Sequence, residues 1–249
     1  MDSAHNASLK SSNALEQWAL AVSFRTLGVA VALVLLLISP TASAEYGTVR
    51  RVFLGSAYTL EQGKLAVGVF SPLQYGLLDE LMFSTHPVLD LLLTPNLSLK
   101  GKVYDGPVAI SFSASYVQTF LKSAKSTFPG MVSAFPMMTV PIGESASLSA
   151  QCGYILDVSP LSHGVMIGGN ATFLIGASDM IQVSVQALWY AKGRGFQVPT
   201  GVLSYGHAWY RMRVTVGIAA GQFPLHVGSG GAKVVNLPVY PVLDLWWQL

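Results

Sequence analysis

Apolar and polar residues alternate along most of the chain after residue 45. The clearest stretch lies between residues 145 and 156, where Ser, Gln and Gly fill one set of alternate positions and mostly apolar residues fill the other: Ala146, Leu148, Ala150, Cys152, Tyr154 and Leu156. The same pattern recurs at 108–116, 181–189 and 211–218. Because successive side chains of a β-strand point to opposite faces, these stretches predict strands with one apolar and one polar face.

The composition of the polar faces indicates where they point. They carry mainly Ser, Thr, Gln and Gly, whereas strand positions that face water in soluble proteins usually carry charged residues. Only 10% of the whole chain is charged, against roughly a quarter in a typical soluble domain, and 51% is hydrophobic. The segments are about 9 to 11 residues long, the length with which a tilted strand crosses a bilayer. We therefore predict an all-β, transmembrane, antiparallel up-and-down β-barrel, with a soluble periplasmic β-sandwich binding protein as the alternative.

Twelve strands are predicted, at 48–58, 64–74, 78–93, 95–103, 107–117, 130–140, 145–157, 164–175, 180–190, 199–207, 210–220 and 236–249. The first two alternate weakly, and ten strands remain if both lie outside the wall. Both numbers are even, as in single-chain bacterial barrels.

The connections differ in length in a regular way. Tight turns are predicted at 75–79, 105–106, 142–144, 176–179 and 207–208, and longer polar or Gly-rich loops at 121–128, 191–197 and 221–233. Short turns on the periplasmic side and long loops outside are typical of outer-membrane barrels. Aromatic residues at the strand ends predict interfacial girdles and include Tyr116, Trp189, Tyr190, Trp209, Tyr210, Trp246 and Trp247.

The first 44 residues predict a secretory signal peptide. Residues 27–38 form an apolar run of 12 residues, preceded by Lys10 and Arg25 and followed by Ala42-Ser43-Ala44. This run is too short for a membrane-spanning helix, and the small residues after it match a cleavage site. Cleavage leaves residues 45–249 as the barrel domain. The alternative is an uncleaved anchor from near residue 20, which would bury Arg25.

Two short motifs carry a resemblance to known proteins. The last eight residues, Val242 to Leu249, alternate up to the chain end, and Tyr75-Gly76-Leu77-Leu78-Asp79-Glu80-Leu81 is echoed at 175–179. The first resembles the C-terminal β-signal of outer-membrane proteins, with Leu249 in place of the usual Phe or Trp. The second resembles the Tyr-Gly-Leu-Thr-Asp-x-Leu turn of small bacterial outer-membrane barrels of the putative transporter type, with Leu78 in place of Thr. The resemblance implies recognition of the C-terminal strand by the barrel assembly machinery.

The sequence contains one weak catalytic candidate. Ser84 and His86 lie two residues apart on the same predicted strand face as Glu80 and Asp90. Some outer-membrane lipid hydrolases pair Ser and His on a barrel strand, and a nucleophile needs a base within hydrogen-bonding reach. Those enzymes, however, place the pair on the lipid-facing surface. Structural polar packing is therefore the favoured interpretation, and a lipid-modifying enzyme is the alternative.

Six charged residues are predicted to line the lumen: Glu80, Asp90, Lys100, Lys102, Arg211 and Arg213. Charges inside a membrane barrel must pair or meet water. The favoured interpretation is an internal salt-bridge network that plugs the lumen. The alternative is an open pore whose basic excess favours anions.

These observations predict a monomer in the bacterial outer membrane, surrounded by lipid, with a structural role or passive transport of small solutes. The net charge of +2 is not clustered and excludes nucleic acid as a partner. No nucleotide-binding loop and no metal-ligand spacing occur in the sequence, so neither cofactor nor metal is expected.

Overall fold

The computed structural model describes residues 46–249 except 70, 88–89, 91–93, 119–129, 159–160, 192–194, 197–198, 210 and 229–230. The predicted signal peptide at 1–44 and the predicted loop at 121–128 lie outside the described residues. Within the described part, no helix is long and apolar enough to cross a membrane.

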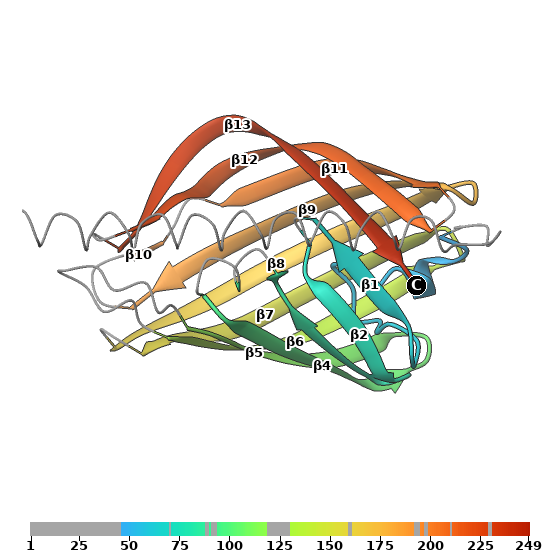
Figure 1. Cartoon of the computed structure of the whole chain (residues 1–249), viewed down its shortest axis with the longest axis horizontal. Helices are drawn as coiled ribbons and strands as arrows, with labels where there is room; N and C mark the ends of the chain where they lie inside the picture. The colour runs from blue at the N-terminus through green and yellow to red at the C-terminus, as the bar shows by residue number, and fades with distance from the viewer. Residues whose placement is uncertain are drawn as a thin grey trace, which may run out of the picture. The chain divides into compact units, whose positions relative to one another are not determined.

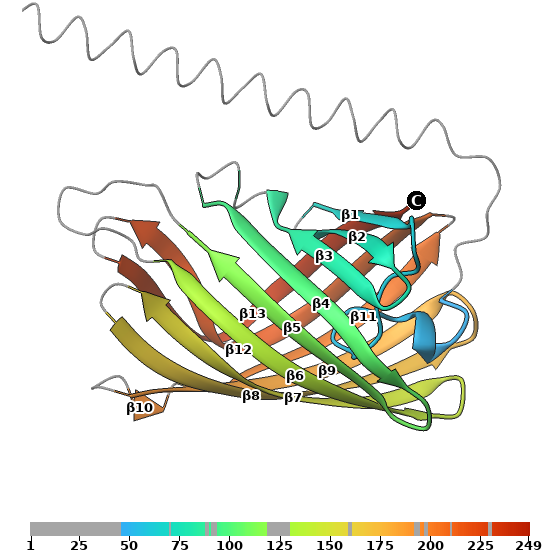
Figure 2. The same ribbon diagram turned by 90° about the horizontal axis from the view of Figure 1, so that it is seen from below.

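The described chain forms a closed antiparallel barrel (Figures 1 and 2). Its strands are β1 (Leu65–Gly68), β2 (Leu73–Leu78), β3 (Leu81–Thr85), β4 (Asn96–Asp105), β5 (Ala109–Val117), β6 (Met131–Ile142), β7 (Ala146–Val158), β8 (Leu161–Ile175), β9 (Asp179–Tyr190), β10 (Gly195–Phe196), β11 (Thr200–Trp209), β12 (Met212–Gly228) and β13 (Gly231–Gln248).

Pairing between the last and first strands closes the wall. Ala66 of β1 lies opposite Gln248 of β13, and each other strand pairs with its neighbour in the chain. The two-residue strand β10 pairs with β9 beside the end of β11, which leaves twelve strands in the wall. The predicted all-β antiparallel barrel of about twelve strands is confirmed.

The side chains of the wall alternate in the sense expected of a membrane barrel. In β7, Ser147 is 2% exposed whereas Leu148, its neighbour, is 51% exposed. Polar side chains buried in the same way include Ser111, Thr139 and Thr172, and large apolar side chains are exposed along every long strand. A β-sandwich buries its apolar faces, so the predicted sandwich alternative is wrong.

The strand assignments at the N-terminal side of the barrel are partly wrong. Residues 48–58 do not form a strand; they contain the 3-10 helix η1 (Val49–Arg51). The predicted strand at 64–74 is divided into β1 and β2, because Pro72 has no N–H for a ladder and the Ser71 N–H donates to Asp244 Oδ1. The predicted strand at 78–93 ends at Thr85 as β3, and the Asp90 N–H then donates to the His86 carbonyl.

The short turns gather at one end of the barrel, as predicted. They lie at 79–80, 106–108, 143–145, 176–178 and 211, and the C-terminus lies at the same end (Figure 2). Residues 75–78 and 207–208 belong to strands, so two predicted turns lie slightly further along the chain. The predicted loop at 221–233 is wrong, because β12 and β13 extend through most of it.

Candidate functional site

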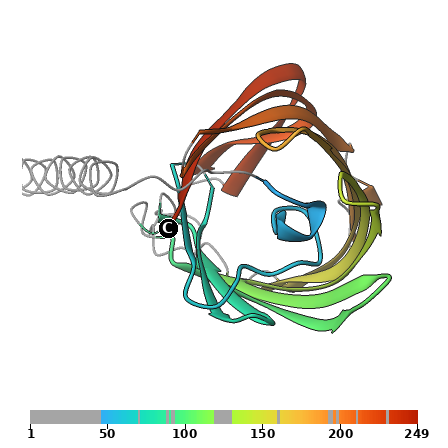
Figure 3. The same cartoon turned by 90° about the vertical axis from the view of Figure 1, so that its right-hand side faces the viewer.

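The N-terminal part of the described chain lies inside the barrel. Figure 3, an end view, shows this part surrounded by the strands. We call residues 46–64 the internal segment. Its apolar side chains are almost completely buried and include Tyr46, Val49, Val52, Phe53, Tyr58 and Leu60.

The internal segment and the wall share one apolar cluster at the end with the short turns. Segment residues contact Met82, Leu174, Met180, Ala208 and Trp246 of five different strands. The rings of Phe53 and Trp246 meet edge to face, with centroids 5.6 Å apart. The predicted girdle residue Trp246 therefore points inward. Its neighbour Trp247 points to the opposite face of the strand.

Backbone hydrogen bonds fix the segment to the turns. The Tyr46 N–H donates to the Ala177 carbonyl at 2.8 Å, and the Val49 N–H donates to the Glu144 carbonyl at 2.9 Å. Arg50 Nη1 donates to Asp105 Oδ1 at 2.8 Å, and Lys102 Nζ donates to the other oxygen of that carboxylate at 2.8 Å. The segment is thus anchored to three turns at one end of the barrel.

Lys100, a residue of the wall strand β4, binds the internal segment. Its side chain is 9% exposed, and Nζ donates to the Phe53 carbonyl at 3.1 Å and to the Ser56 carbonyl at 2.5 Å. No carboxylate of the described residues pairs with this ammonium group. The charge is therefore stabilised by the backbone of the internal segment.

Arg213 lies between the segment and the wall. Its guanidinium carbon is 4.6 Å from the ring centre of Trp246 and 5.4 Å from that of Tyr46. Nε and Nη1 are buried without a hydrogen-bond partner in the described structure. Burial raises the pKa of the Tyr46 hydroxyl to about 12, so this ring faces Arg213 in its neutral form.

The six charged residues predicted to line the lumen lie in different surroundings. Lys100, Lys102 and Arg213 contact the segment or its anchor Asp105. Glu80 lies exposed in the turn after β2, and Arg211 lies in the turn before β12. Asp90 is exposed beyond the end of β3, where it accepts a hydrogen bond from Thr85 Oγ1 at 2.7 Å. In this arrangement the apolar cluster, which the sequence did not reveal, fills the turn end of the lumen.

Ser84 and His86 do not form a catalytic pair in the described structure. Ser84 belongs to β3 and lies opposite Gln74 and Ser98. His86 follows the strand, and its backbone N–H and carbonyl are both bonded to the Asn96 side chain. His86 Nδ1 is buried without a partner, and no hydrogen bond joins it to Ser84.

A cavity of about 290 Å³ adjoins the tip of the internal segment, Leu54-Gly55. We call it the lumen chamber. Its wall consists of parts of β6 to β9 and β11 and presents both apolar and polar groups; its hydroxyl and carboxamide side chains are Ser149, Gln151, Asn170, Gln182, Ser184, Gln186 and Thr200. None of the described lining residues carries a charge. Sequence reasoning found the polar faces of β7 and β9 but could not show that they meet at a cavity.

Two carboxamides also hold the tip of the segment. Asn170 Nδ2 donates to the Gly55 carbonyl at 3.2 Å, and Gln182 Nε2 donates to the Leu54 carbonyl at 3.4 Å. Thr172 Oγ1 accepts from both amides, at 3.1 and 3.2 Å. The segment tip is therefore one side of the chamber and is bonded to the polar wall.

Comparison with known proteins gives one group of matches. No protein-family model and no curated protein matches the chain. Among solved structures, the outer-membrane expressed form of OmpT from Vibrio cholerae is 12% identical, with a TM-score of 0.47, and the match covers 72% of this chain and 64% of that chain. The in-vitro folded OmpT is 11% identical with a TM-score of 0.44, covering 83% of this chain and 71% of that chain. Its trimer form is 10% identical with a TM-score of 0.42, covering 83% and 76%.

This chain thus spans slightly less than two thirds of the first of these structures. The solved structures are outer-membrane proteins. The barrel fold of this chain is shown by its own strand pairing. The identities and TM-scores are too low for a functional role of these structures to be assigned to this chain.

Proposed function

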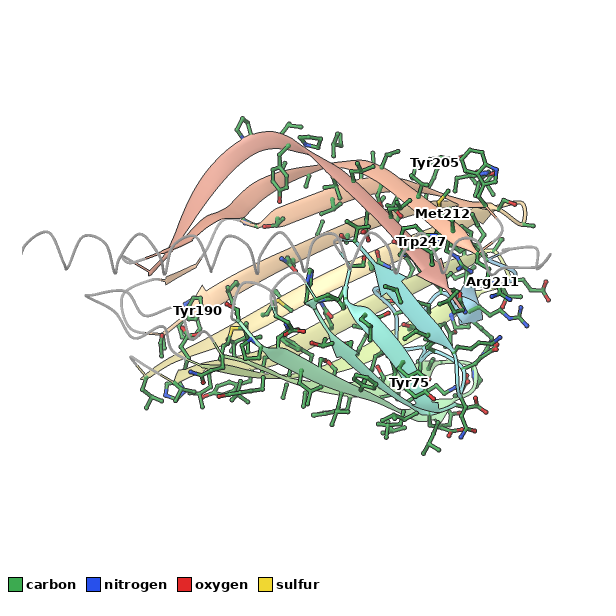
Figure 4. The ribbon with its side chains drawn as sticks, in the orientation of Figure 1. Tyr75, Tyr190, Tyr205, Arg211, Met212 and Trp247 are labelled. Carbon is green, nitrogen blue, oxygen red and sulfur yellow. The ribbon has the colours of Figure 1, made fainter. Side chains whose placement is uncertain are left out.

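We propose that this chain is an integral barrel of the bacterial outer membrane that allows passive passage of small solutes when its internal segment moves. The apolar outer face supports insertion in lipid, because a bilayer leaves no water for exposed sheet edges and a closed barrel has none. The aromatic residues also support placement in a membrane. Tyr205 and Trp247 lie toward the end with the short turns, and Tyr190 lies at the opposite end of the barrel (Figure 4).

The observation that carries the proposal is how the lumen is filled. The turn end is filled by the internal segment, whereas the lumen chamber beyond its tip is open and carries uncharged hydroxyl and carboxamide groups. Lys100 and Arg213 of the wall contact the segment, and neither has a carboxylate partner among the described residues, although burying a charge is costly. When the segment moves, both side chains would face a water-filled passage and favour anions.

The structure offers a specific way to lock the segment. An ideal Cβ on Gly55 lies 3.7 Å from the Asn170 Cβ, within the roughly 3.5–4.5 Å range of disulfides. The backbone φ of Gly55 is 68°, so a cysteine there costs about 1–2 kcal/mol, which a disulfide can offset. We expect the Gly55→Cys/Asn170→Cys variant, made in a Cys152→Ser background, to be silent in a planar bilayer when oxidised. Conductance should return on addition of a reductant.

Three controls make this test specific. Cys152→Ser alone and the two single-cysteine variants should conduct with or without the reductant. Heat-modifiable migration on a gel should show that every variant is folded. Steady conductance of the oxidised double variant would contradict gating by the segment, and a folded wild-type protein that never conducts would favour a structural barrel.

We also propose that the barrel assembly machinery recognises the C-terminal strand. In support, β13 ends one residue before the chain end and closes the barrel against β1. Replacing the alternate apolar residues Leu243 and Leu245 with Ser should reduce the amount of folded barrel in the outer membrane. Exchange of Asp244 for Asn, which keeps the apolar pattern, is the matched control.

A further inference from the structure

The lumen chamber has the chemistry of a binding site for an uncharged, hydroxyl-rich small molecule. Its seven polar side chains are all hydroxyls or carboxamides, which both donate and accept hydrogen bonds. Sugars and polyols present the same kind of groups at close spacing. A charged solute would lose hydration in the chamber without meeting an opposite charge.

Two glutamines of this lining have no hydrogen bond in the described structure. Gln151 of β7 and Gln186 of β9 both lie opposite Gly168 of β8. An ideal Cβ on Gly168 would be 3.0 Å from Gln151 Nε2, so the Gln151 amide packs over this glycine in space that a larger side chain would need. The lining thus presents two carboxamides, one on each side of Gly168, that have no hydrogen bond within the described part of the chain.

The neighbouring residues extend this polar lining. Thr200 of β11 continues the same row beyond Gln186, and the next row towards the segment contains Ser149, Asn170 and Ser184. The tip residues Leu54 and Gly55 close this side with an apolar surface and a backbone carbonyl. A small ring with hydroxyls at its edge and C–H groups on its faces fits such surroundings.

We infer that the lumen chamber binds an uncharged polyhydroxylated molecule of monosaccharide size, with Gln151 and Gln186 donating to and accepting from its hydroxyls. The volume of about 290 Å³ lies at the lower limit of the roughly 300–1,000 Å³ of ligand pockets and matches a molecule of this size. The inference rests on the proposed function and names a solute that the closed barrel would hold beside the internal segment. In the closed state Lys100 and Arg213 are covered by this segment and do not line the chamber.

The test is saturation-transfer NMR on the full chain folded in detergent, with D-glucose, D-glucuronate and D-glucosamine as probes. The three share a carbon skeleton and are neutral, anionic and cationic. We expect a saturable signal from glucose and much weaker signals from both charged probes. Gln151→Leu and Gln186→Leu should each weaken glucose binding about threefold to tenfold, the loss expected for one hydrogen bond.

Gln74→Leu is the matched control, because Gln74 is a buried wall glutamine of β2 that does not line the chamber. It should leave glucose binding unchanged. Equal binding of the three probes, unchanged binding in both chamber variants, an equal loss in Gln74→Leu, or no glucose signal at all would overturn the inference.

Bilayer recordings on the same preparations separate this inference from the proposed function. Conductance without glucose binding would leave the passage in place and remove the sugar site. Glucose binding by a protein that never conducts would support the site and remove the passage.

Discussion

At Gly76 the wall and the backbone of the internal segment approach each other closely. An ideal Cβ at this position would lie 2.1 Å from the Glu61 carbonyl oxygen and 2.7 Å from that of Leu60. Both are backbone atoms that cannot rotate away, and the Gly76 carbonyl also accepts from the Gly63 N–H at 2.9 Å. We expect Gly76→Ala to lower the free energy of unfolding by about 1–3 kcal/mol, the usual cost of overpacking.

The measurement for Gly76→Ala is denaturant unfolding, followed through the heat-modifiable band. Gly169→Ala is the control, since the nearest atom to its ideal Cβ is 3.5 Å away. An equal effect of the two substitutions would show that the close approach at Gly76 carries no special cost. The glycine of the Tyr-Gly-Leu motif would then be explained by the turn alone.

At the scale of elements, the long strands could be predicted and the internal segment could not. Strands β5 to β9 have one face towards the lumen and one outward, so their sequences alternate. The buried apolar residues of 46–64, such as Val49, Val52 and Phe53, lie in backbone that is not a strand, so they do not alternate with polar residues. Its contacts come from strands distant in the sequence, such as Trp246 and Met180.

The same limit explains the candidate site. Arg211 and Arg213 are two residues apart, so the alternation predicts the same strand face for both. Only Arg213 lies within β12, where it packs against the segment and is 6% exposed. The polar lining of the chamber could be predicted strand by strand from Gln151, Gln182 and Gln186. Its closure by Leu54-Gly55 depends on the segment and was not predictable.

The internal segment should loosen at high pH through Tyr46. Burial raises the pKa of this hydroxyl from 10.0 to about 12, so folding favours its neutral form. The resulting stabilisation, roughly 2–3 kcal/mol, is fully present below pH 10 and is lost as the pH rises from about 10 to 12. We expect Tyr46→Phe to retain the docked segment over this range.

Fluorescence of Trp246, whose ring meets Phe53 of the segment, provides the measurement for Tyr46→Phe. The emission of Trp246 is obtained by subtraction. For the wild type and for Tyr46→Phe, the spectrum of the same protein carrying Trp246→Phe is subtracted from the spectrum with Trp246 present. The wild-type contribution should shift to longer wavelength between about pH 10 and 12 as the ring meets water, and the Tyr46→Phe contribution should shift less. Identical curves would exclude Tyr46 as the controlling group.

At the scale of the whole molecule, a charge on the exposed apolar face should affect stability differently in water and in lipid. Ile167 is 55% exposed on the outer face of β8, near the middle of this strand. In water a lysine at such a position changes stability by about 0.5 kcal/mol or less, whereas near the middle of a bilayer it costs about 2–4 kcal/mol. We therefore expect Ile167→Lys to lower the free energy of unfolding in lipid vesicles by the larger amount.

Gln186→Lys provides the comparison, because this side chain lines the lumen chamber on a neighbouring strand. Its ammonium group can stay hydrated within the barrel, so the substitution should cost much less than Ile167→Lys in vesicles. Urea titration of both variants in the same vesicles measures the difference. If both cost equally little, lipid does not surround the barrel. If only the outward lysine is costly, the apolar surface lies in the bilayer and the chamber beside it is wet, and passage through this barrel requires both.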